Sequence, residues 1–412
     1  MKQPAVVATT LVFALTYLLI AWPRLRWLPI GRPAAALLGA VLMVVIGTLT
    51  PARAYAAVDG NTLVLLVALM ALSGYLERAG LFARLSELAL KSKLSPAGLL
   101  TVLVFASGAL SALLLNDTVC VFLTPVVCSV CVSRGLPLGP FLLALATSSN
   151  IGSAATLIGN PQNILIGSLG PLDFAHYAAA VAPATLLALA LNALLLRICF
   201  ARALASAHGA RLRVQQAAAS TRMKLAPLLV TLLAAVGYAA GLHLAFTTLA
   251  AVALLILLER REPTALFTAV DWPLVVFFAS LFIVVDGFAA TGFPSAAWAF
   301  VAPHLELRQA SGVAWFTGYT LVGSNLFSNV PLVMLTGPLL AKLTSPERAF
   351  ALLGFVSTVA GNLTLLGSVA NLIVAERARQ HYELGFVEYL RFGLASTLLV
   401  LAAGVPVVCL LT

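Results

Sequence analysis

The stretch SNIGSAATLIGNPQN, from Ser149 to Asn163, interrupts a chain that otherwise consists largely of apolar runs. It holds three asparagines, two serines, two glycines, a threonine and a proline. Backbone that leaves the helical conformation is very costly in hydrocarbon unless it lines a cavity inside the protein. If the neighbouring runs cross a membrane, this stretch predicts a broken span that faces a polar cavity.

The composition indicates a membrane protein. Of the 412 residues, 61% are hydrophobic and 9% are charged, which excludes an ordinary soluble domain. Apolar runs of about 17–25 residues, the length that a bilayer requires of a helix, recur from end to end. We expect an all-α polytopic membrane protein with about ten spans and two further apolar hairpins. The spans are expected at residues 4–22, 34–50, 61–78, 140–170, 175–198, 225–241, 243–258, 273–290, 347–376 and 388–411, and the hairpins at 97–133 and 312–343.

The basic residues predict the orientation. With these spans, 19 of the 24 Lys and Arg residues fall on one side of the membrane and five on the other. The side rich in basic residues is expected to be cytoplasmic, so both termini lie outside. The formal net charge of +10 is then a topology signal, and the expected partner is the lipid bilayer rather than nucleic acid. We expect a multi-pass protein of a bacterial-type cytoplasmic (inner) membrane.

The chain repeats itself. TLIGNPQN (Thr156–Asn163) matches TLLGSVAN (Thr364–Asn371) at an offset of 208 residues, and SALLLNDTVCVFLTP (Ser111–Pro125) matches SNLFSNVPLVMLTGP (Ser324–Pro338) at an offset of 213. Two repeats, 1–198 and 225–412, are therefore expected, joined by a basic cytoplasmic linker at 199–224. Each repeat contains five spans, an odd number, so the second is predicted to be inverted relative to the first.

Both repeats have the same expected order of elements. Three spans, the scaffold spans within 1–78 and 225–290, precede a hairpin, a broken span (140–170 or 347–376) and a closing span (175–198 or 388–411). The charge pattern fits a re-entrant hairpin and two complete spans equally well. The polar hairpin tips favour the re-entrant form. These tips contain Asn116, Asp117 and Thr118 in the first repeat, and Ser324, Asn325, Ser328 and Asn329 in the second.

Two hairpin tips and two span breaks should supply the chemistry. Pro161 and Pro331 are expected where helices begin, since the missing N–H would be unbonded there. Helix starts offer free amide donors and partial positive charge to an oxyanion, while unwound carbonyls and side-chain oxygens can hold Na⁺. The alternative is that the small polar residues only hold helices together. Function is favoured for the repeated pairs Asn116/Asn329, Asn163/Asn371 and Gly159/Gly367.

The candidate site residues come from these four interruptions. The substrate-binding candidates are Asn116, Thr118, Thr156, Asn163, Ser328, Asn329, Thr364 and Asn371. The coupling-ion candidates are Asp117, Asn150, Gly159, Asn362 and Gly367, with a Na⁺ site at Asn116, Asn150 and Asn163. We expect no cofactor and no tightly bound metal, only a transported Na⁺ or H⁺.

Four motifs resemble a known family. LLNDTVCVFLTPVV, SSNIGSAATLIGNPQNILIG, GSNLFSNVPLVML and GNLTLLGSVANLIVAE are similar to those of the ion transporter superfamily, which includes citrate-transporter-like permeases, divalent anion–sodium symporters, arsenite-efflux permeases and a sodium/proton antiporter branch. The resemblance implies re-entrant hairpins, a homodimer with a scaffold and a mobile domain, and elevator-type alternating access. In the dicarboxylate branch a Ser-Asn-Thr tip contacts the substrate carboxylate and sodium. The matching positions are Asn116, Asp117 and Thr118, and Ser328, Asn329 and Val330.

Asp117 and Val330 depart from the dicarboxylate pattern. An ionised Asp117 in a partly dry site would repel a polyanion, so the aspartate is protonated in part of the cycle, or pairs with a cation, or the substrate is not a polyanion. No Arg or Lys lies inside either break. An Asn-Asp first tip also resembles the arsenite-efflux permeases. Asp117 is the first candidate for the coupling residue, since intramembrane carboxylates are functional by default; the alternative is that it only caps the second helix of the hairpin.

These observations predict a secondary active transporter of a small anion or oxyanion, coupled to H⁺ or Na⁺. The alternative is an arsenite/antimonite efflux permease driven by the proton gradient, followed by a Na⁺/H⁺ antiporter. A channel is disfavoured because two inverted, divergent halves suit alternating access. We do not expect an enzyme, since no Ser/His, His/Glu/His or paired-Asp arrangement occurs at membrane depth.

Overall fold

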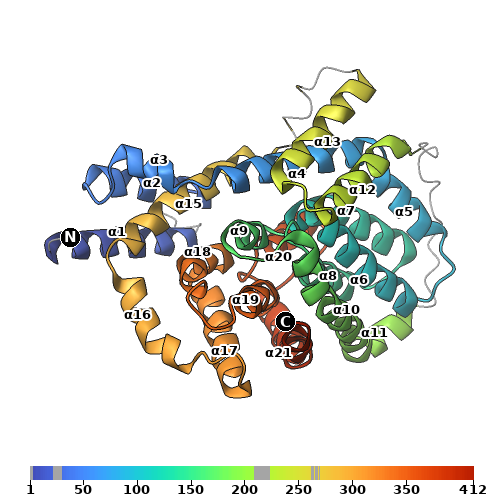
Figure 1. Ribbon diagram of the computed structural model, residues 1–412. Helices are drawn as coiled ribbons and strands as arrows, with labels where there is room; N and C mark the ends of the chain where they lie inside the picture. Colours follow the sequence, from blue (N-terminus) through green and yellow to red (C-terminus); the bar gives the residue numbers. More distant parts are fainter. Residues whose placement is uncertain (1–2, 22–29, 208–222, 261–263, 265–267, 269) are drawn as a thin grey trace.

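The computed structural model describes residues 3–21, 30–207, 223–260, 264, 268 and 270–412. In these residues all regular secondary structure is helical, which confirms the all-α fold (Figure 1). The expected segments coincide with helices to within a few residues, except that the second span ends at Val45 and a short helix follows it. Residues 208–222 of the expected linker 199–224 lie outside the described residues.

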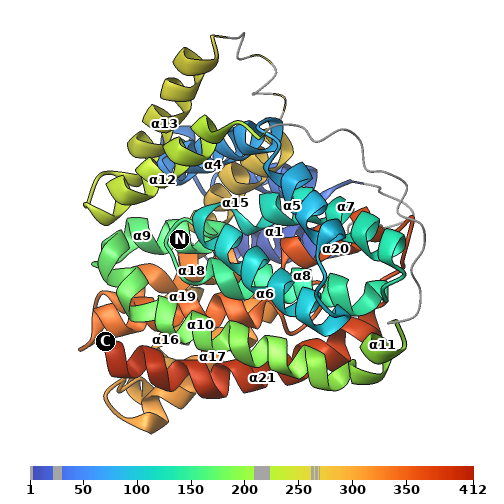
Figure 2. The same cartoon turned by 90° about the vertical axis from the view of Figure 1, so that its right-hand side faces the viewer.

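The helices form two groups, which lie one above the other in Figure 2. The scaffold group packs through α2 against α15 and through α4 against α13. It consists of α1 (Gln3–Ala21), α2 (Arg32–Val45), α3 (Pro51–Ala57), α4 (Gly60–Arg78), α12 (Leu225–Ala239), α13 (Leu244–Glu259) and α15 (Trp272–Ala289).

The second group, the hairpin bundle, packs mainly through α6 against α8 and through α10 against α21. It consists of α6 (Pro96–Leu113), α7 (Asn116–Arg134), α8 (Leu138–Ser153), α9 (Pro161–Leu169), α10 (Phe174–Cys199), α17 (Ala310–Phe327), α18 (Asn329–Leu340), α19 (Pro346–Ala360), α20 (Val369–Ala378) and α21 (Phe386–Leu411). Peripheral helices are α5 (Leu81–Lys91), α11 (Ala201–Ser206), α16 (Phe293–Val301) and the 3₁₀ turn η2 (Ala302–His304).

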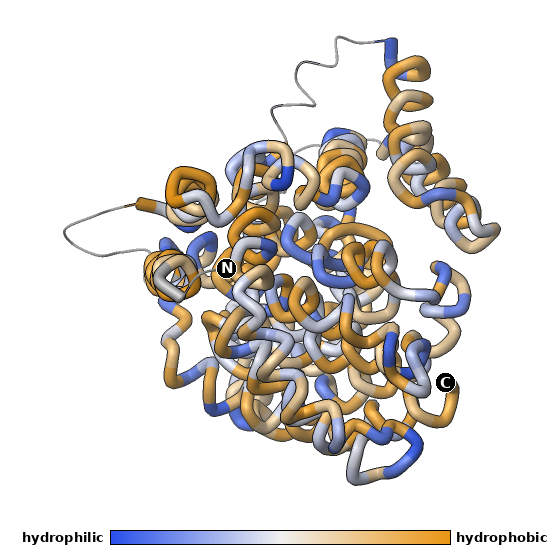
Figure 3. Tube along the Cα trace, turned by 60° about the vertical axis from the view of Figure 1, so that its left-hand side comes forward, coloured by the Kyte–Doolittle hydropathy of each residue, from blue (hydrophilic) through white to orange (hydrophobic). Residues whose placement is uncertain are grey.

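The surface of the molecule suits lipid. Hydrophobic residues run along most of the helices in Figure 3, and hydrophilic residues gather at helix ends and turns. Among the described helices, α4, α6, α7, α10, α15 and α21 are long and apolar enough to cross a membrane. Large apolar side chains such as Leu11, Val45 and Leu257 are exposed, as lipid-facing side chains would be.

Local chemistry explains the interruptions. The chain leaves α8 at Ser153 and starts α9 at Pro161, the first helical position, where proline is tolerated. Asn160 caps α9, because its Oδ1 accepts from Asn163 N at 2.8 Å. The first hairpin packs unusually close to α8, since a Cβ on Gly152 would lie 2.2 Å from Gly108 Cα. This close approach brings the hairpin tip to the break.

Candidate functional site

One cavity is lined by residues from all four interruptions. It has a volume of about 210 Å³ and lies between the scaffold group and the hairpin bundle. The first tip contributes Asn116 and Asp117, the first break contributes Pro161 and Gln162, the second tip contributes residues 324–331, and the second break contributes residues 366–369. Its volume corresponds to about seven water molecules. The cavity is therefore large enough for a small oxyacid or carboxylate.

Four helices of the hairpin bundle begin at this cavity. The first residues of α7, α9 and α20 line it, namely Asn116, Pro161 and Val369, as does Asn329 at the start of α18. The first backbone amides of a helix have no partner within the helix, and its N-terminus carries a partial positive charge. Four N-termini around one small cavity favour an oxygen-rich, electron-rich ligand.

Asn150 links the two repeats behind the cavity wall. Its Oδ1 accepts from Asn116 Nδ2 at 2.9 Å and from Ser368 Oγ at 3.0 Å. Its Nδ2 donates to Asn362 Oδ1 at 2.8 Å and to Asn371 Oδ1 at 2.9 Å. Both hydrogen-bonding atoms are thus fully used by the protein, and the side chain is only 2% exposed. Asn150 therefore holds the first tip against the second break.

The contacts around the breaks show a reciprocal pattern. The offset of 208 residues relates Asn150 to Thr358 and Ser368 to Asn160. Ser368 Oγ donates to Asn150 Oδ1, and Asn160 Nδ2 donates to Thr358 Oγ1 at 3.1 Å. The contact between these two positions is therefore made twice, once in each direction across the two halves. This is the arrangement expected of a pseudo-two-fold axis.

Asn163 and Asn371 hold the breaks in place. Asn163 Nδ2 donates to Thr156 O at 2.9 Å and to Ser153 O at 3.3 Å. Asn371 Nδ2 makes the equivalent bonds, to Thr364 O at 3.1 Å and to Gly361 O at 2.8 Å. Both side chains are completely buried and neither lines the cavity. They satisfy carbonyl groups that the end of the preceding helix leaves unpaired.

The first tip is hydrogen-bonded to the first break. Asn116 N donates to Gly159 O at 2.9 Å, and Thr156 Oγ1 donates to Ala112 O at 2.6 Å. A Cβ on Gly159 would lie 2.2 Å from Ser153 O, so only glycine fits there. The Asn116 side chain is also satisfied at both ends, since its Oδ1 accepts from Asp117 N at 2.9 Å.

The second tip has fewer bonds. Asn329 is 7% exposed, yet its Oδ1 has no partner among the described residues, whereas Ser324 Oγ and its counterpart Ser111 Oγ in the first hairpin are both unpaired. A Cβ on Gly361 would lie 3.2 Å from Asn329 Nδ2, so this amide faces the second break without bonding to it. Ser328 joins α17 and α18 with φ 69° and ψ 159°, a conformation of glycine that costs another residue about 1–3 kcal/mol.

Two polar cavity residues come from the scaffold group and were missed in the sequence. Arg32 begins α2 and Tyr17 lies in the last turns of α1, and both line the cavity. Arg32 attracts the Asp117 carboxylate electrostatically, whereas Asp271, the cap of α15, repels it. Arg32 looked like one more basic residue at a span end. Only the packing of α2 beside the first tip distinguishes it from the others.

The predicted residues thus divide into two sets. Those that line the cavity are Asn116, Asp117, Ser328, Asn329 and Gly367. Those that do not are Thr118, Asn150, Thr156, Gly159, Asn163, Asn362, Thr364 and Asn371. Most of the second set forms the hydrogen-bonded layer directly behind the wall, including Asn362, whose Nδ2 donates to Thr147 O at 3.0 Å.

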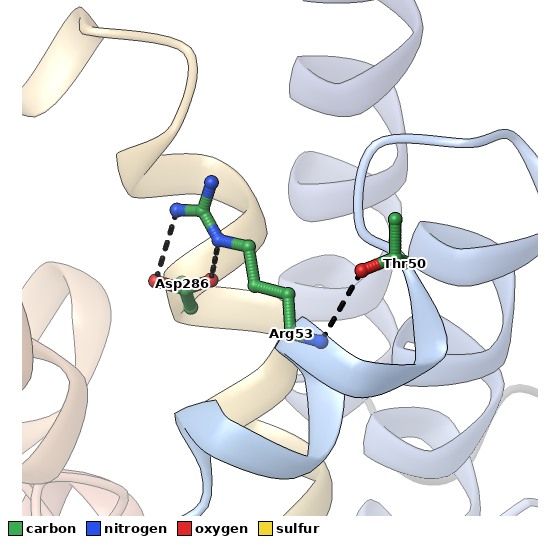
Figure 4. Close-up of polar contacts among 3 residues, drawn as sticks. All are labelled: Thr50, Arg53 and Asp286. Carbon is green, nitrogen blue, oxygen red and sulfur yellow. Dashed lines mark hydrogen bonds and ion pairs between the residues drawn. The ribbon is translucent and has the colours of Figure 1, made fainter.

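Asp286, a carboxylate near the end of α15, has a structural partner. Arg53 of α3 donates from Nε to Asp286 Oδ2 at 2.9 Å and from Nη2 to Oδ1 at 3.3 Å (Figure 4). Thr50 caps α3 by accepting from Arg53 N at 3.3 Å. The ion pair is partly exposed and does not line the cavity. It joins α3 to α15 within the scaffold group.

A second cavity, of about 200 Å³, lies between α4, the turn from α12 to α13, and the segment from α9 to α10. None of the predicted site residues lines it. Within the described part of the chain, no group of three His, Cys, Asp or Glu side chains is placed to hold a metal ion. The chemistry therefore concentrates at the cavity of the four helix starts.

The fold and the site define a membrane transporter of the ion transporter superfamily. The chain belongs to the citrate transporter family (CitMHS), whose model matches residues 17–349. It is 35% identical to the silicon efflux transporter LSI3 of Oryza sativa subsp. japonica, over 98% of both chains. It is 30% identical to a Dictyostelium discoideum transporter named arsB, over 98% of this chain and 92% of the relative.

A solved structure has the same fold. The YdaH transporter of Alcanivorax borkumensis superposes with a TM-score of 0.54 at 18% sequence identity, covering 98% of both chains. At this identity the likeness concerns the fold alone. Together with the family match, it confirms the prediction of a polytopic transporter of this superfamily.

Proposed function

We propose that this protein is a secondary active transporter that moves a small oxyanion, or the acid from which it derives, across the cytoplasmic membrane. The observation that carries the proposal is the single cavity at which both tips and both breaks meet, at the starts of four helices. Such helix starts bind an oxygen-rich ligand without a full positive charge. Asn116, Ser328 and Asn329 are the proposed substrate-binding residues that face it.

Asp117 is the proposed coupling residue. It is the one carboxylate among the cavity-lining residues, and Arg32 faces the same cavity from the scaffold group. Protonation of Asp117 would remove a negative charge next to the bound substrate, so proton binding and substrate binding are linked. A proton therefore fits this site better than Na⁺ as the coupling ion. The tip and break residues remain the proposed ligands for Na⁺ if sodium is coupled instead.

Alternating access is proposed to move the hairpin bundle against the scaffold group. The scaffold residues of the cavity, such as Tyr17 and Arg32, lie at helix ends that the basic residues assign to the cytoplasm. The present conformation would then be inward-facing. Phe13 of α1 stacks on Phe288 of α15 at 3.8 Å and neighbours Phe327 of the second tip at 6.4 Å, and this cluster is proposed to close the opposite side. A homodimer held by the scaffold group is part of this proposal.

A second candidate is efflux of arsenite or antimonite driven by the proton gradient. Asp117 favours it, because a carboxylate tolerates a neutral hydroxide better than a di- or trianion. The relatives named silicon efflux transporter and arsB also support it. Dissolved silicon and arsenite are both uncharged hydroxides at neutral pH. In this case the inward-facing cavity would load substrate from the cytoplasm.

The test is counterflow in proteoliposomes that contain the purified protein. Arsenite, antimonite, sulfate, succinate and citrate would be offered in turn, each with and without Na⁺ or a pH gradient. We expect saturable exchange of one chemical class and dependence on one ion. Linear, unsaturable flux would indicate a channel, and no flux of any compound would contradict the proposal.

A further inference from the structure

Besides Ser324 Oγ, two polar atoms at the cavity are unused by the proposed cycle. Tyr17 OH on α1 and Asn325 Oδ1 on α17 belong to cavity-lining residues, and neither atom has a partner in the described part of the chain. One comes from the scaffold group and the other from the hairpin bundle. Buried polar atoms without a partner are rare in proteins and unfavourable, so each requires an explanation.

The orientation of the Asn325 amide is fixed. Its Nδ2 donates to Leu321 O at 2.9 Å and to Ala360 O at 3.2 Å, and a flipped amide would place an oxygen against both carbonyls. The free atom is therefore the oxygen. A Cβ on Gly367 would lie 3.3 Å from this oxygen, so it points toward the second break. An amide oxygen only accepts hydrogen bonds, so its missing partner must be a donor.

The Tyr17 hydroxyl can donate and accept. Its ring lies 4.4 Å from the ring of Phe13 and makes an edge contact with Phe327 at 6.3 Å. Phe327 is the last residue of α17, so the position of the second tip determines what reaches the hydroxyl.

Neither atom is exposed to water in this conformation. The chain between α17 and α18 consists of Ser328 alone, in its left-handed conformation. A shift of the tip about this residue would move Phe327 and Asn325 together. A molecule bound in the cavity would thereby gain access to both atoms.

We infer that Tyr17 and Asn325 are substrate-binding residues that select a ligand with hydroxyl hydrogens. An acid that retains its hydroxyl protons offers Asn325 Oδ1 the donor that it lacks. A fully deprotonated anion such as sulfate offers only acceptors and leaves this oxygen unpaired. The inference rests on the proposed function and names the chemical form in which the substrate binds.

The experiment compares arsenite, which carries three hydroxyl groups at pH 7, with sulfate, which carries none. Two quantities would be measured for wild type, Tyr17→Phe and Asn325→Ala. They are the arsenite concentration that gives half-maximal counterflow, and the inhibition of arsenite counterflow by sulfate. Tyr389→Phe is the matched control, because Tyr389 OH is also buried without a partner but lies on α21 away from the cavity. We expect half-saturation for arsenite to rise about three- to tenfold in Tyr17→Phe and Asn325→Ala, with unchanged sulfate inhibition and an unchanged control.

Failure of the inference can be told from failure of the proposed function. If sulfate, succinate or citrate is exchanged and arsenite is not, the inference is overturned, whereas the proposed transport function is supported. The same holds if arsenite is exchanged and Tyr17→Phe leaves its half-saturation unchanged. Tyr17→Phe removes one oxygen atom, so it still tests the contact between the hydroxyl and arsenite if Asn325→Ala does not fold, and a change in sulfate inhibition in this variant would overturn the selection for hydroxyl hydrogens. If no compound is exchanged, both proposals fall.

Discussion

The two hairpin tips of this transporter occupy equivalent places in the chain and have very different surroundings. The first tip is bonded to its break through Asn116 N and Gly159 O, and its amide is tied to the second break through Asn150. At the second tip the oxygens of Asn325 and Asn329 have no partner among the described residues, and the chain turns at a strained Ser328. Similar sequences have thus produced one tip that is hydrogen-bonded to its break and one tip whose amide oxygens are unpaired.

The difference between the tips indicates that one tip has a structural role and the other a substrate-binding role. Buried and fully satisfied amides make a rigid, specific structure, whereas unsatisfied ones mark a place where a partner is missing. The first tip and the layer behind it set the geometry of the cavity and present Asp117. The second tip supplies the groups that a substrate completes. We expect substitutions at the first tip to affect stability first, and substitutions at the second tip to affect transport first.

The largest effect is expected for Asn150→Ala. This change removes four hydrogen bonds and leaves three buried atoms, Asn116 Nδ2, Asn362 Oδ1 and Asn371 Oδ1, without a partner. The free energy of unfolding should fall by about 3–5 kcal/mol, at about 1–3 kcal/mol for each unsatisfied group. Thermal unfolding in detergent would measure it. If the loss of unfolding free energy were no larger than that of Asn329→Ala, the two tips would not differ in their contribution to stability.

Gly159→Ala should have the next largest effect. Its free energy of unfolding should fall by about 3 kcal/mol, because the new Cβ would overlap Ser153 O. Gly60→Ala is the control, since a Cβ there meets nothing within 4 Å. The melting temperatures of both variants would be compared with wild type. Equal melting temperatures would mean that the first tip does not depend on this close approach.

Asn329→Ala should separate transport from stability. The Asn329 oxygen has no partner in the described structure, so the melting temperature should stay near that of wild type. Transport should fall at least about tenfold, since a buried polar contact with substrate is worth about 1–2 kcal/mol. Counterflow and thermal unfolding would be measured on the same preparation. Full transport by this variant would remove the second tip from the site.

Asp117→Asn tests the one charge that the first tip presents to the cavity. The variant should fold, because the amide has the shape of the carboxylate, and its transport should no longer respond to a pH gradient. Initial rates at several external pH values would show this. A pH profile identical to that of wild type would exclude Asp117 from coupling.

The smallest effect is expected for Ser328→Gly. Glycine adopts the observed φ of 69° without strain, so stability should rise by about 1 kcal/mol. The melting temperature would be compared with that of wild type. A decrease would show that the second tip is not strained at this residue.

The sequence predicted the helices, the two breaks and the two tips, because helix-breaking and polar residues cluster at these interruptions, whereas isolated prolines such as Pro125 and Pro183 stay inside helices. Pro161 does begin α9, and Pro331 lies in the first turn of α18. It could not predict which asparagines face the cavity. Asn163 and Asn329 are similar in sequence context, but the first bonds to the carbonyls of its own break while the second faces the cavity.

The scaffold residues could not be predicted for a different reason. Tyr17 and Arg32 are far in sequence from the tips, and reach the cavity only because α1 and α2 pack beside it. Neither belongs to a repeated motif. Residues that complete a site from a separate group of helices depend on tertiary packing alone, and a single sequence carries no local signal for them.

The most direct test of the account is hydrogen–deuterium exchange at the two tips in the reconstituted protein. Peptides that cover 111–118 and 324–331 would be compared with and without a transported compound. We predict slow exchange at the first tip in both conditions, and fast exchange at the second tip that slows when the compound binds. Equal protection of both tips, unchanged by the compound, would contradict the assignment of the second tip as the element that closes on substrate.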